Sequence, residues 1–530
     1  MKRNFRLISA VFAIVICLSS CKKAIEETVY TSVSNHKIYS SEAGAAAVLA
    51  SAYEPFNSSV YYGGYMLELK CAASTYFYNN QLRSAGAVQY HDFSLNSAAP
   101  YISNCWQYSY RVIARANDVI YNVQKATFNE DAKKRILGEA YFLRAFVFFD
   151  NYVLWGGIPL RTEPPSPENL NMPRASEAEV VKQIIADLDL AKANMAEPAQ
   201  AVAGRPNKYA ANALAMKLYI KLAGNDQSSP YWQKAIDEGL VIYNAQPYKL
   251  VFPYVDLWDA AKQPASKETI FEIQFSESQP GGRSPGYNFT PSSSVLSGGV
   301  STSERIAVNK ETFDYHTAQY PTDPRIDASY VHTSYLKGTT VTKIYPDVTL
   351  NPAVSGRYWP YVKKYTGKVT GNSSSGNLIL LRYADVLLML AEAENEVRGP
   401  QGAYKYVNEV LKRARYLTAT TNATTPDDWR DMTQSQFRQR IMDERRYELM
   451  GELHEYLDVR RRGIEYFRAA AIGHNTHPAN VKMMVGNPPP YEYIIPTDDA
   501  TLKRGMLMPI PNTEMSSNSL ITIKDQNPGY

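Results

Sequence analysis

The sequence predicts a mostly α-helical protein built from antiparallel helix pairs, with long loop-rich excursions and a few short strands. Two observations lead to this fold class. Apolar residues recur three to four positions apart in several long segments, which is the pattern of the buried face of a helix. Ala391 and Ala403 lie on either side of a Gly399-Pro400 turn. The two alanines are twelve residues apart, and small residues at this spacing are typical of tetratricopeptide-like helix pairs.

The composition is that of a globular protein with one unusual feature, its tyrosine content. The chain has 530 residues, of which 45% are hydrophobic and 20% charged, values that exclude a disordered or fibrous chain. Its 56 basic and 52 acidic residues nearly cancel, so the charge gives no indication of nucleic-acid binding. The 40 tyrosines supply many flat rings with one polar end, which is a first hint of function.

Residues 1–20 are predicted to be a signal peptide, and Cys21 is predicted to be lipidated. Three basic residues precede an apolar stretch, residues 7–18, that is shorter than the roughly 20 residues of a spanning helix. It leads into Leu-Ser-Ser-Cys, which matches the bacterial lipobox. Each buried CH₂ adds about 0.8 kcal/mol of membrane affinity, so two or three acyl chains form a lasting tether. Lys22 in place of Asp favours the outer membrane over the inner one.

The region 21–250 is expected to contain the first set of helices. Residues 53–100 interrupt it with an aromatic, Asn-, Ser- and Gly-rich stretch that has little helical period. Phe142, Phe146 and Phe149 follow helical spacing, and Gly156 ends the helix that carries them. The other expected helices are residues 30–53, 106–121, 176–195, 207–222 and 231–243.

The region 251–530 is expected to combine a loop-rich insertion with further helices. Gly, Pro, Ser and Tyr are abundant in residues 252–376, where only short strand-like runs occur, such as residues 269–275 and 340–345. Helices are expected at residues 380–397, in the following segment that contains Ala403, and at residues 435–450. The rest of the chain is expected to be a non-periodic, Pro-rich tail.

The sequence contains none of the common catalytic or cofactor motifs. It lacks the phosphate-binding loop, the Rossmann glycine pattern, the HExxH zinc motif and the EF-hand spacing, so no enzyme activity, cofactor or metal site is predicted. His474 and His477 have no Cys or carboxylate at ligand spacing and are expected in a solvated loop. Cys71 and Cys105 could form a disulfide or remain two buried thiols. Two glycosidase carboxylates meeting from distant positions stay an open alternative.

Several blocks, in their order and spacing, resemble the SusD/RagB family of outer-membrane lipoproteins. The most specific is LRYADVLLMLAEAE at residues 381–394, followed by an Asn-x-Val pattern that Leu411 and Lys412 alter. His454 also departs from the family, which more often has Arg there. The other matching blocks are residues 106–120, EAYFLRAFVFFDNYVLWGGIPL at 139–160, Asp-Pro-Arg at 323–325, residues 444–461, Met-Pro-Ile-Pro at 508–511 and the terminal QNPGY.

The resemblance implies a SusD-like α-superhelix and a role in nutrient capture at the cell surface. Members of this family bind glycans and deliver them to a SusC-like TonB-dependent outer-membrane transporter. The RagB branch implies an alternative, in which the cargo is peptide. A surface enzyme and a purely structural lid are further alternatives from other functional classes.

Rings in the loop-rich excursions are the candidate ligand contacts. Tyr287 and Trp359, together with Tyr61, Tyr62 and Tyr65, lie where no helical stripe places them in a core, and exposed rings can stack on the apolar faces of sugars. The alternative is that they pack on the scaffold and order the loops. By contrast, two sets of residues are expected to be structural. The first is the rings at helical spacing: Trp106, Phe142, Phe146, Phe149, Tyr152 and Trp155. The second is a set of charged residues expected to form a buried ion-pair network: Glu444, Arg445, Arg446, Glu448, Asp458, Arg460 and Arg461.

Overall fold

The computed structural model describes residues 35–79, 89–198, 204–276, 284–347, 358–366, 369–370, 373–418, 420–484 and 493–530. The predicted signal peptide and Cys21 lie outside the described residues. No helix in the described part of the chain combines the length and apolar character needed to cross a membrane.

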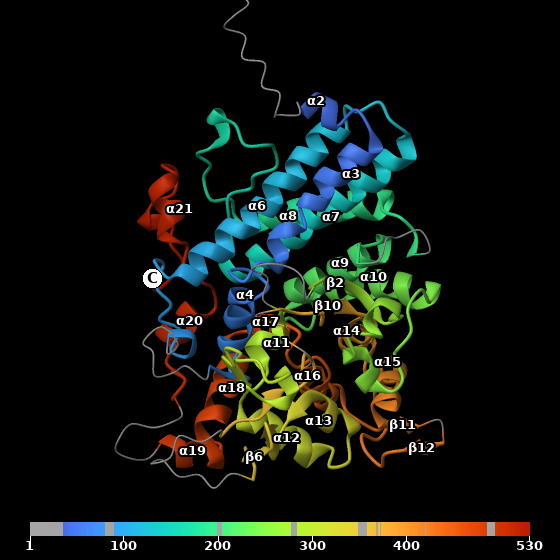
Figure 1. Ribbon diagram of the computed structural model, residues 1–530, viewed down its shortest axis with the longest axis vertical. Helices are drawn as coiled ribbons and strands as arrows, with labels where there is room; N and C mark the ends of the chain where they lie inside the picture. Colours follow the sequence, from blue (N-terminus) through green and yellow to red (C-terminus); the bar gives the residue numbers. More distant parts are fainter. Residues whose placement is uncertain are drawn as a thin grey trace, which may run out of the picture.

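The N-terminal half consists of long helices that pack in sequence order (Figure 1). α6 packs against α7, α7 against α8, α8 against α9, and α9 against α10. This arrangement confirms the helix pairs predicted from periodicity. The helices are α2 (Asn35–Ile38), α3 (Glu42–Ser51), α4 (Tyr65–Leu67), α6 (Pro100–Val123), α7 (Glu130–Trp155), α8 (Glu177–Asn194), α9 (Lys208–Ala223) and α10 (Tyr231–Ala245), with the single-turn helices η1 (Glu54–Asn57), η2 (Glu68–Ala72), a π-helix, and η3 (Pro167–Asn169).

The C-terminal half continues the helical array through α14 (Tyr383–Arg398), which packs against α10, α15 and α16. Ala391 and Ala403 are fully buried, and Gly399 turns the chain with φ of 82° before Pro400 begins α15, as predicted. The remaining helices are α11 (Pro285–Phe289), α12 (Lys310–Gln319), α13 (Pro324–Ser329), α15 (Pro400–Arg415), α16 (Gln434–Glu448), α17 (Glu455–Arg461), α18 (Ile464–Thr476), α19 (Pro478–Met484), α20 (Asp499–Gly505) and α21 (Asn512–Ser517), with η5 (Tyr254–Trp258), η6 (Gln263–Ala265), η7 (Val295–Ser297) and η8 (Ile523–Asp525).

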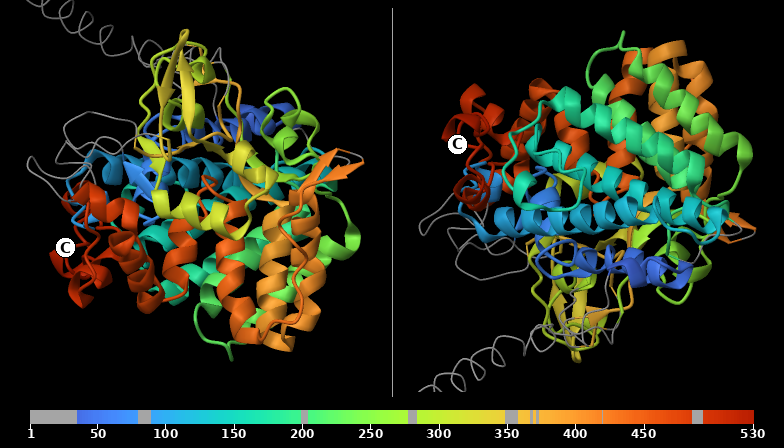
Figure 2. Two further views of the ribbon diagram at one scale, coloured as in Figure 1. Left: turned by 90° about the horizontal axis from the view of Figure 1, so that it is seen from below. Right: turned by 90° about the horizontal axis from the view of Figure 1, so that it is seen from above.

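Short antiparallel strands order the loop-rich excursions. The largest sheet has the strand order β1-β3-β7-β4, and the β5–β6 hairpin projects from the body of the protein (Figure 2). The pairs β10–β2, β11–β12 and β8–β9 stand apart from this sheet. The strands are β1 (Phe77–Asn79), β2 (Thr269–Ile273), β3 (Ile306–Val308), β4 (Tyr330–Val331), β5 (Ser334–Lys337), β6 (Thr340–Lys343), β7 (Tyr361–Val362), β8 (Val369–Thr370), β9 (Ser373–Ser374), β10 (Leu378–Arg382), β11 (Tyr416–Thr418) and β12 (Thr421–Asn422).

Buried ion pairs connect the C-terminal helices to the excursions. Arg382 donates to Glu448 and Glu452, each at 2.6 Å, and Arg325 donates to Glu444 at 2.6 Å. All of these side chains are inaccessible to solvent. The network confirms that the charged motif residues are structural. Arg445 pairs with Asp385 and Asp458, and Arg461 pairs with Glu392 and Asp458. Arg460 donates to the carbonyls of Ala73 and Gly505, and the Arg446 guanidinium lies over the Tyr76 ring.

Several parts of the fold differ from the sequence prediction. The insertion 252–376, expected to hold only short strand-like runs, also contains α11, α12 and α13. The expected helix 380–397 begins only at Tyr383, because its first residues belong to β10, which pairs with β2. The segment predicted as a non-periodic tail contains α17 to α21. Four of these five helices have seven residues or fewer, too short for their apolar spacing to show a helical period.

Candidate ligand-binding site

Three of the predicted ligand contacts are buried rings. Tyr61 and Tyr62 are 0% exposed; they contact each other edge to face at 4.9 Å and surround Phe56. Trp359 is 5% exposed and stacks on Tyr78, with ring centroids 3.7 Å apart. With no face open to a ligand, these three rings order the excursions, which was the alternative the sequence left open.

Tyr65 and Tyr287, the other two predicted contacts, are only half-buried. The structure brings their segments together although they come from different excursions. The Asn288 side chain, next to Tyr287, donates a hydrogen bond of 3.0 Å to the carbonyl of Gly63, two residues before Tyr65. Ligand contact therefore remains a prediction for Tyr65 and Tyr287.

Tyr65 is part of a half-buried row of rings that we call the tyrosine face: Tyr65, Tyr101 and Tyr108. The Tyr65 and Tyr101 rings meet edge to face at 5.8 Å. Tyr101 and Tyr108 are seven residues apart on α6, so they lie on one side of the helix two turns apart. All three are partly exposed while packing on the core. The exposed Arg111 continues the row, with its guanidinium 4.3 Å from the Tyr108 ring centroid.

An ion pair next to the tyrosine face adds a cation to it. The Arg305 Nη1 atom donates to Glu68 Oε1 at 2.6 Å, and the Tyr90 hydroxyl donates to Glu68 Oε2 at 3.2 Å. Burial acts to lower the pKa of the Arg305 guanidinium, but Glu68 outweighs this effect and raises it. Burial, followed by Glu68, raises the pKa of both Tyr90 and Tyr101. The site thus presents the charged Arg305 guanidinium and the protonated Tyr101 phenol, both hydrogen-bond donors.

Sequence reasoning did not find Tyr101, Tyr108 and Arg305. The two tyrosines share α6 with core residues such as Trp106 and Ile113, so the helical pattern gave no reason to separate them. Their i, i+7 spacing, on a different side of the helix from Trp106, was the available signal. Arg305 lies in a loop and becomes a candidate only through its contact with Glu68.

The remaining predicted chemistry is structural in character. Cys71 and Cys105 are buried free thiols. His474 is buried, with Nδ1 2.8 Å from Glu311 Oε1 and its ring stacked on Tyr493; it does not lie in the solvated loop expected from sequence. His474 and His477 fall in or beside α18 and α19. Within the described residues, no group of three or more His, Cys, Asp or Glu side chains is arranged to hold a metal ion.

The fold and the tyrosine face together define a tetratricopeptide-like superhelix with a half-exposed aromatic surface. Two family models match this chain: one described as "SusD family" over residues 267–530, and one described as "Starch-binding associating with outer membrane" over residues 26–220. The SusD-like protein P25 of Formosa agariphila is 28% identical over 504 residues, covering 86% of this chain and 90% of the relative. The chain belongs to the SusD-like family.

Solved structures share the fold. A SusD homologue from Bacteroides thetaiotaomicron superimposes with a TM-score of 0.76 at 20% identity, over 94% of this chain and 99% of the other. A laminarin-binding SusD-like protein gives a TM-score of 0.66 at 21% identity, over 92% of this chain and 99% of the other.

Proposed function

We propose that this protein is a lipid-anchored, cell-surface glycan-binding protein of the outer membrane. The observation that carries the proposal is the tyrosine face, which presents three half-buried rings beside the Arg305 guanidinium. Residues 1–20 are removed as a signal peptide, Cys21 carries the lipid, and the regions 21–250 and 251–530 form the two parts of the mature protein.

The chemistry of the face suits sugars. Each sugar ring has an apolar C–H face that can stack on a tyrosine ring. The phenol O–H and guanidinium N–H groups can donate hydrogen bonds to the sugar hydroxyls. If each ring contact contributes about 1 kcal/mol, three rings and a few hydrogen bonds give millimolar to micromolar affinity. The binding is weak enough for release to a next carrier.

Similar proteins support this ligand class and the location. One family description names starch and the outer membrane, and one similar structure is named for laminarin. Both are glucans. The protein acts by binding rather than by catalysis, and it delivers its ligand to a SusC-like TonB-dependent transporter, as its family resemblance implies.

A glycan array of the lipid-free protein, residues 22–530, tests the ligand class. Maltoheptaose and laminarin oligosaccharides are included as probes, and a peptide array is run in parallel. Binding to one or more glycans supports the proposal. Binding to peptides and to no glycan would establish the RagB-like alternative instead. Recovery of a TonB-dependent barrel with the protein from mildly solubilised outer membranes tests the partner.

A further inference from the structure

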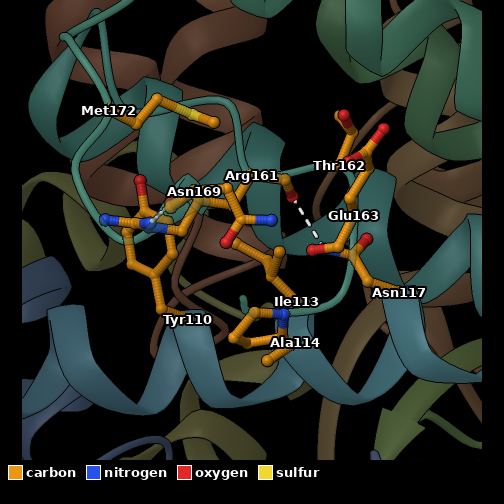
Figure 3. A pocket seen from close by; sticks show the side chains of 10 residues that line it. Tyr110, Ile113, Ala114, Asn117, Arg161, Thr162, Glu163, Asn169 and Met172 are labelled. Atoms are coloured by element: carbon orange, nitrogen blue, oxygen red, sulfur yellow. Dashed lines mark hydrogen bonds between the residues drawn. The ribbon is translucent and has the colours of Figure 1, made fainter. Parts of the chain in front are cut away.

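A second candidate site lies on another side of α6, away from the tyrosine face. It is a pocket of about 290 Å³ between α6 and the segment 161–172 (Figure 3). Tyr110, Ile113 and Asn117 point from α6 toward this segment, and Met172 faces them from the segment. Tyr108 of the tyrosine face and Tyr110 of the pocket are two residues apart on α6, so their side chains project from roughly opposite sides of the helix. The pocket therefore belongs to a different surface from the proposed glycan site.

The outer wall of the pocket is held rigidly. The Arg161 guanidinium donates to the carbonyls of Asn169 and Leu170 at 2.7 and 2.8 Å. Ser166 and Asn169 form a reciprocal capping box at η3. The backbone of Met172 exchanges two hydrogen bonds with the Asn518 side chain, at 3.1 and 2.8 Å. A preformed wall lowers the entropy cost of binding.

The interior of the pocket offers mainly apolar surface. Asn117 donates to the carbonyls of Arg161 and Glu163 and accepts from Arg144. The Tyr110 hydroxyl donates to the carbonyl of Pro159 at 2.8 Å. These polar groups are therefore already satisfied. A ligand meets the Tyr110 ring, Ala114 and Met172, which are partly exposed.

The mouth of the pocket carries negative charge, and an exposed apolar residue follows one of its lining residues in sequence. The Glu163 side chain is exposed and forms no ion pair with any described residue. Glu168, on the same segment, is also exposed. Leu170, which follows the pocket-lining Asn169 in sequence, is 56% exposed. The single cation of the segment, Arg161, is committed to backbone carbonyls and lies 3.6 Å from Glu514.

We propose that this pocket is a docking site for a partner polypeptide, which inserts one large apolar side chain next to a basic residue. The volume is slightly below the 300–1,000 Å³ typical of pockets for whole small-molecule ligands, so it suits a single side chain. Apolar anchors in preformed pockets commonly dominate protein interfaces. The exposed Glu163 carboxylate, which has no ion-pair partner among the described residues, complements a lysine or arginine adjacent to the anchor.

Methyl NMR of the lipid-free protein, residues 22–530 with labelled methionine methyl groups, tests the proposal. The probes are acetyl-Trp-Lys-amide and acetyl-Trp-Glu-amide at millimolar concentration, and the Met172 signal is assigned with Met172→Leu. We expect a saturable shift of the Met172 methyl signal, with the Lys peptide binding about two- to fivefold more tightly, as an exposed ion pair allows. Ala114→Phe should abolish the shift because it fills the pocket, and Glu163→Gln should remove the preference for Lys.

Several outcomes would overturn the proposal. These are no Met172 shift with either peptide, an unchanged shift in a folded Ala114→Phe protein, or equal affinity for the two peptides in the unmodified protein. A Met172 shift caused by maltoheptaose instead would make the pocket a sugar site. Glu163→Gln changes an exposed residue, so it keeps the charge test valid if Ala114→Phe lowers the melting temperature.

Discussion

Arg382 Nη1 donates to Glu448 Oε1 at 2.6 Å in the solvent-inaccessible centre of the C-terminal half. Arg382 ends β10, and Glu448 ends α16. The same guanidinium also reaches Glu268 and Glu452. One arginine thus ties the strand pair that precedes α14 to the charged helix predicted from sequence.

Arg382→Met should destabilise the protein strongly. Removing one member of a buried ion-pair network leaves carboxylates without compensation and typically costs about 3–5 kcal/mol. Chemical denaturation measures the effect. The matched control is Arg398→Ala, because the Arg398 side chain, which pairs with Glu394, is 48% exposed. We expect this variant to lose about 0.5 kcal/mol or less of folding free energy. Equal losses in the two variants would contradict a structural role for the network.

Glu455 should make stability fall as the pH rises. Burial raises the pKa of Glu455 from 4.5 to about 7, and its Oε2 atom has no hydrogen-bond partner among the described residues. Between these two values the unfolded chain loses this proton while the folded protein keeps it. The folded state is therefore penalised increasingly as the pH rises from about 4.5 to 7, by about 3 kcal/mol in total.

Glu455→Gln stays neutral at every pH and should lack this slope. Thermal melts of both proteins between pH 4.5 and 8 measure it. We expect the variant to gain stability relative to the unmodified protein across this range. Parallel pH profiles would show that the Glu455 carboxyl titrates normally.

Trp359→Ala should act on folding rather than on ligand binding. Trp359 is buried against Tyr78, and the Lys310 ammonium lies 4.7 Å from its ring centroid. Removing a buried aromatic ring typically costs about 3–5 kcal/mol. Chemical denaturation measures the loss of folding free energy, and glycan titration measures any loss of binding. Tyr121→Ala is the control, because Tyr121 is 50% exposed. A stable Trp359→Ala protein with reduced glycan affinity would restore Trp359 as a ligand contact.

Cys21→Ser should release the protein from the membrane without affecting its fold. The acyl chains supply the tether, and α3, which packs on α6 and α7, begins at Glu42, well after Cys21. Cell fractionation in a strain that lacks the partner transporter measures the effect. Retention of the Ser variant in the outer membrane would contradict the lipid anchor.

The fold was predictable where the buried stripe is long, and the site was not. Residues such as Phe142, Phe146 and Phe149 repeat over several turns, so α7 was clear from sequence. The last three residues of β10, 380–382, are predicted as helix because LILLR, buried on both faces, runs directly into α14. Both faces are apolar, so neither period distinguishes strand from helix.

Loop rings were the harder problem, because exposure is a property of the tertiary structure. Trp359 and Tyr61 lack a helical period, yet each is buried by a ring from elsewhere in the chain, Tyr78 and Tyr108 respectively. Conversely, Tyr101 lies on a core helix but is half-exposed, with the Tyr65 and Tyr90 rings packed against it. The sequence around each ring does not indicate these contact partners.

Isothermal titration of the lipid-free protein with the best glycan from the array tests the central claim most directly. Tyr65→Ala and Tyr101→Ala are compared with Tyr121→Ala, an exposed tyrosine on α6 outside the tyrosine face, and melting temperatures confirm that all three variants fold. We predict that each of the first two loses about 1 kcal/mol or more of binding free energy, roughly fivefold in Kd, while Tyr121→Ala binds like the unmodified protein. Unchanged affinity in both Tyr65→Ala and Tyr101→Ala would contradict the assignment of the tyrosine face as the glycan site.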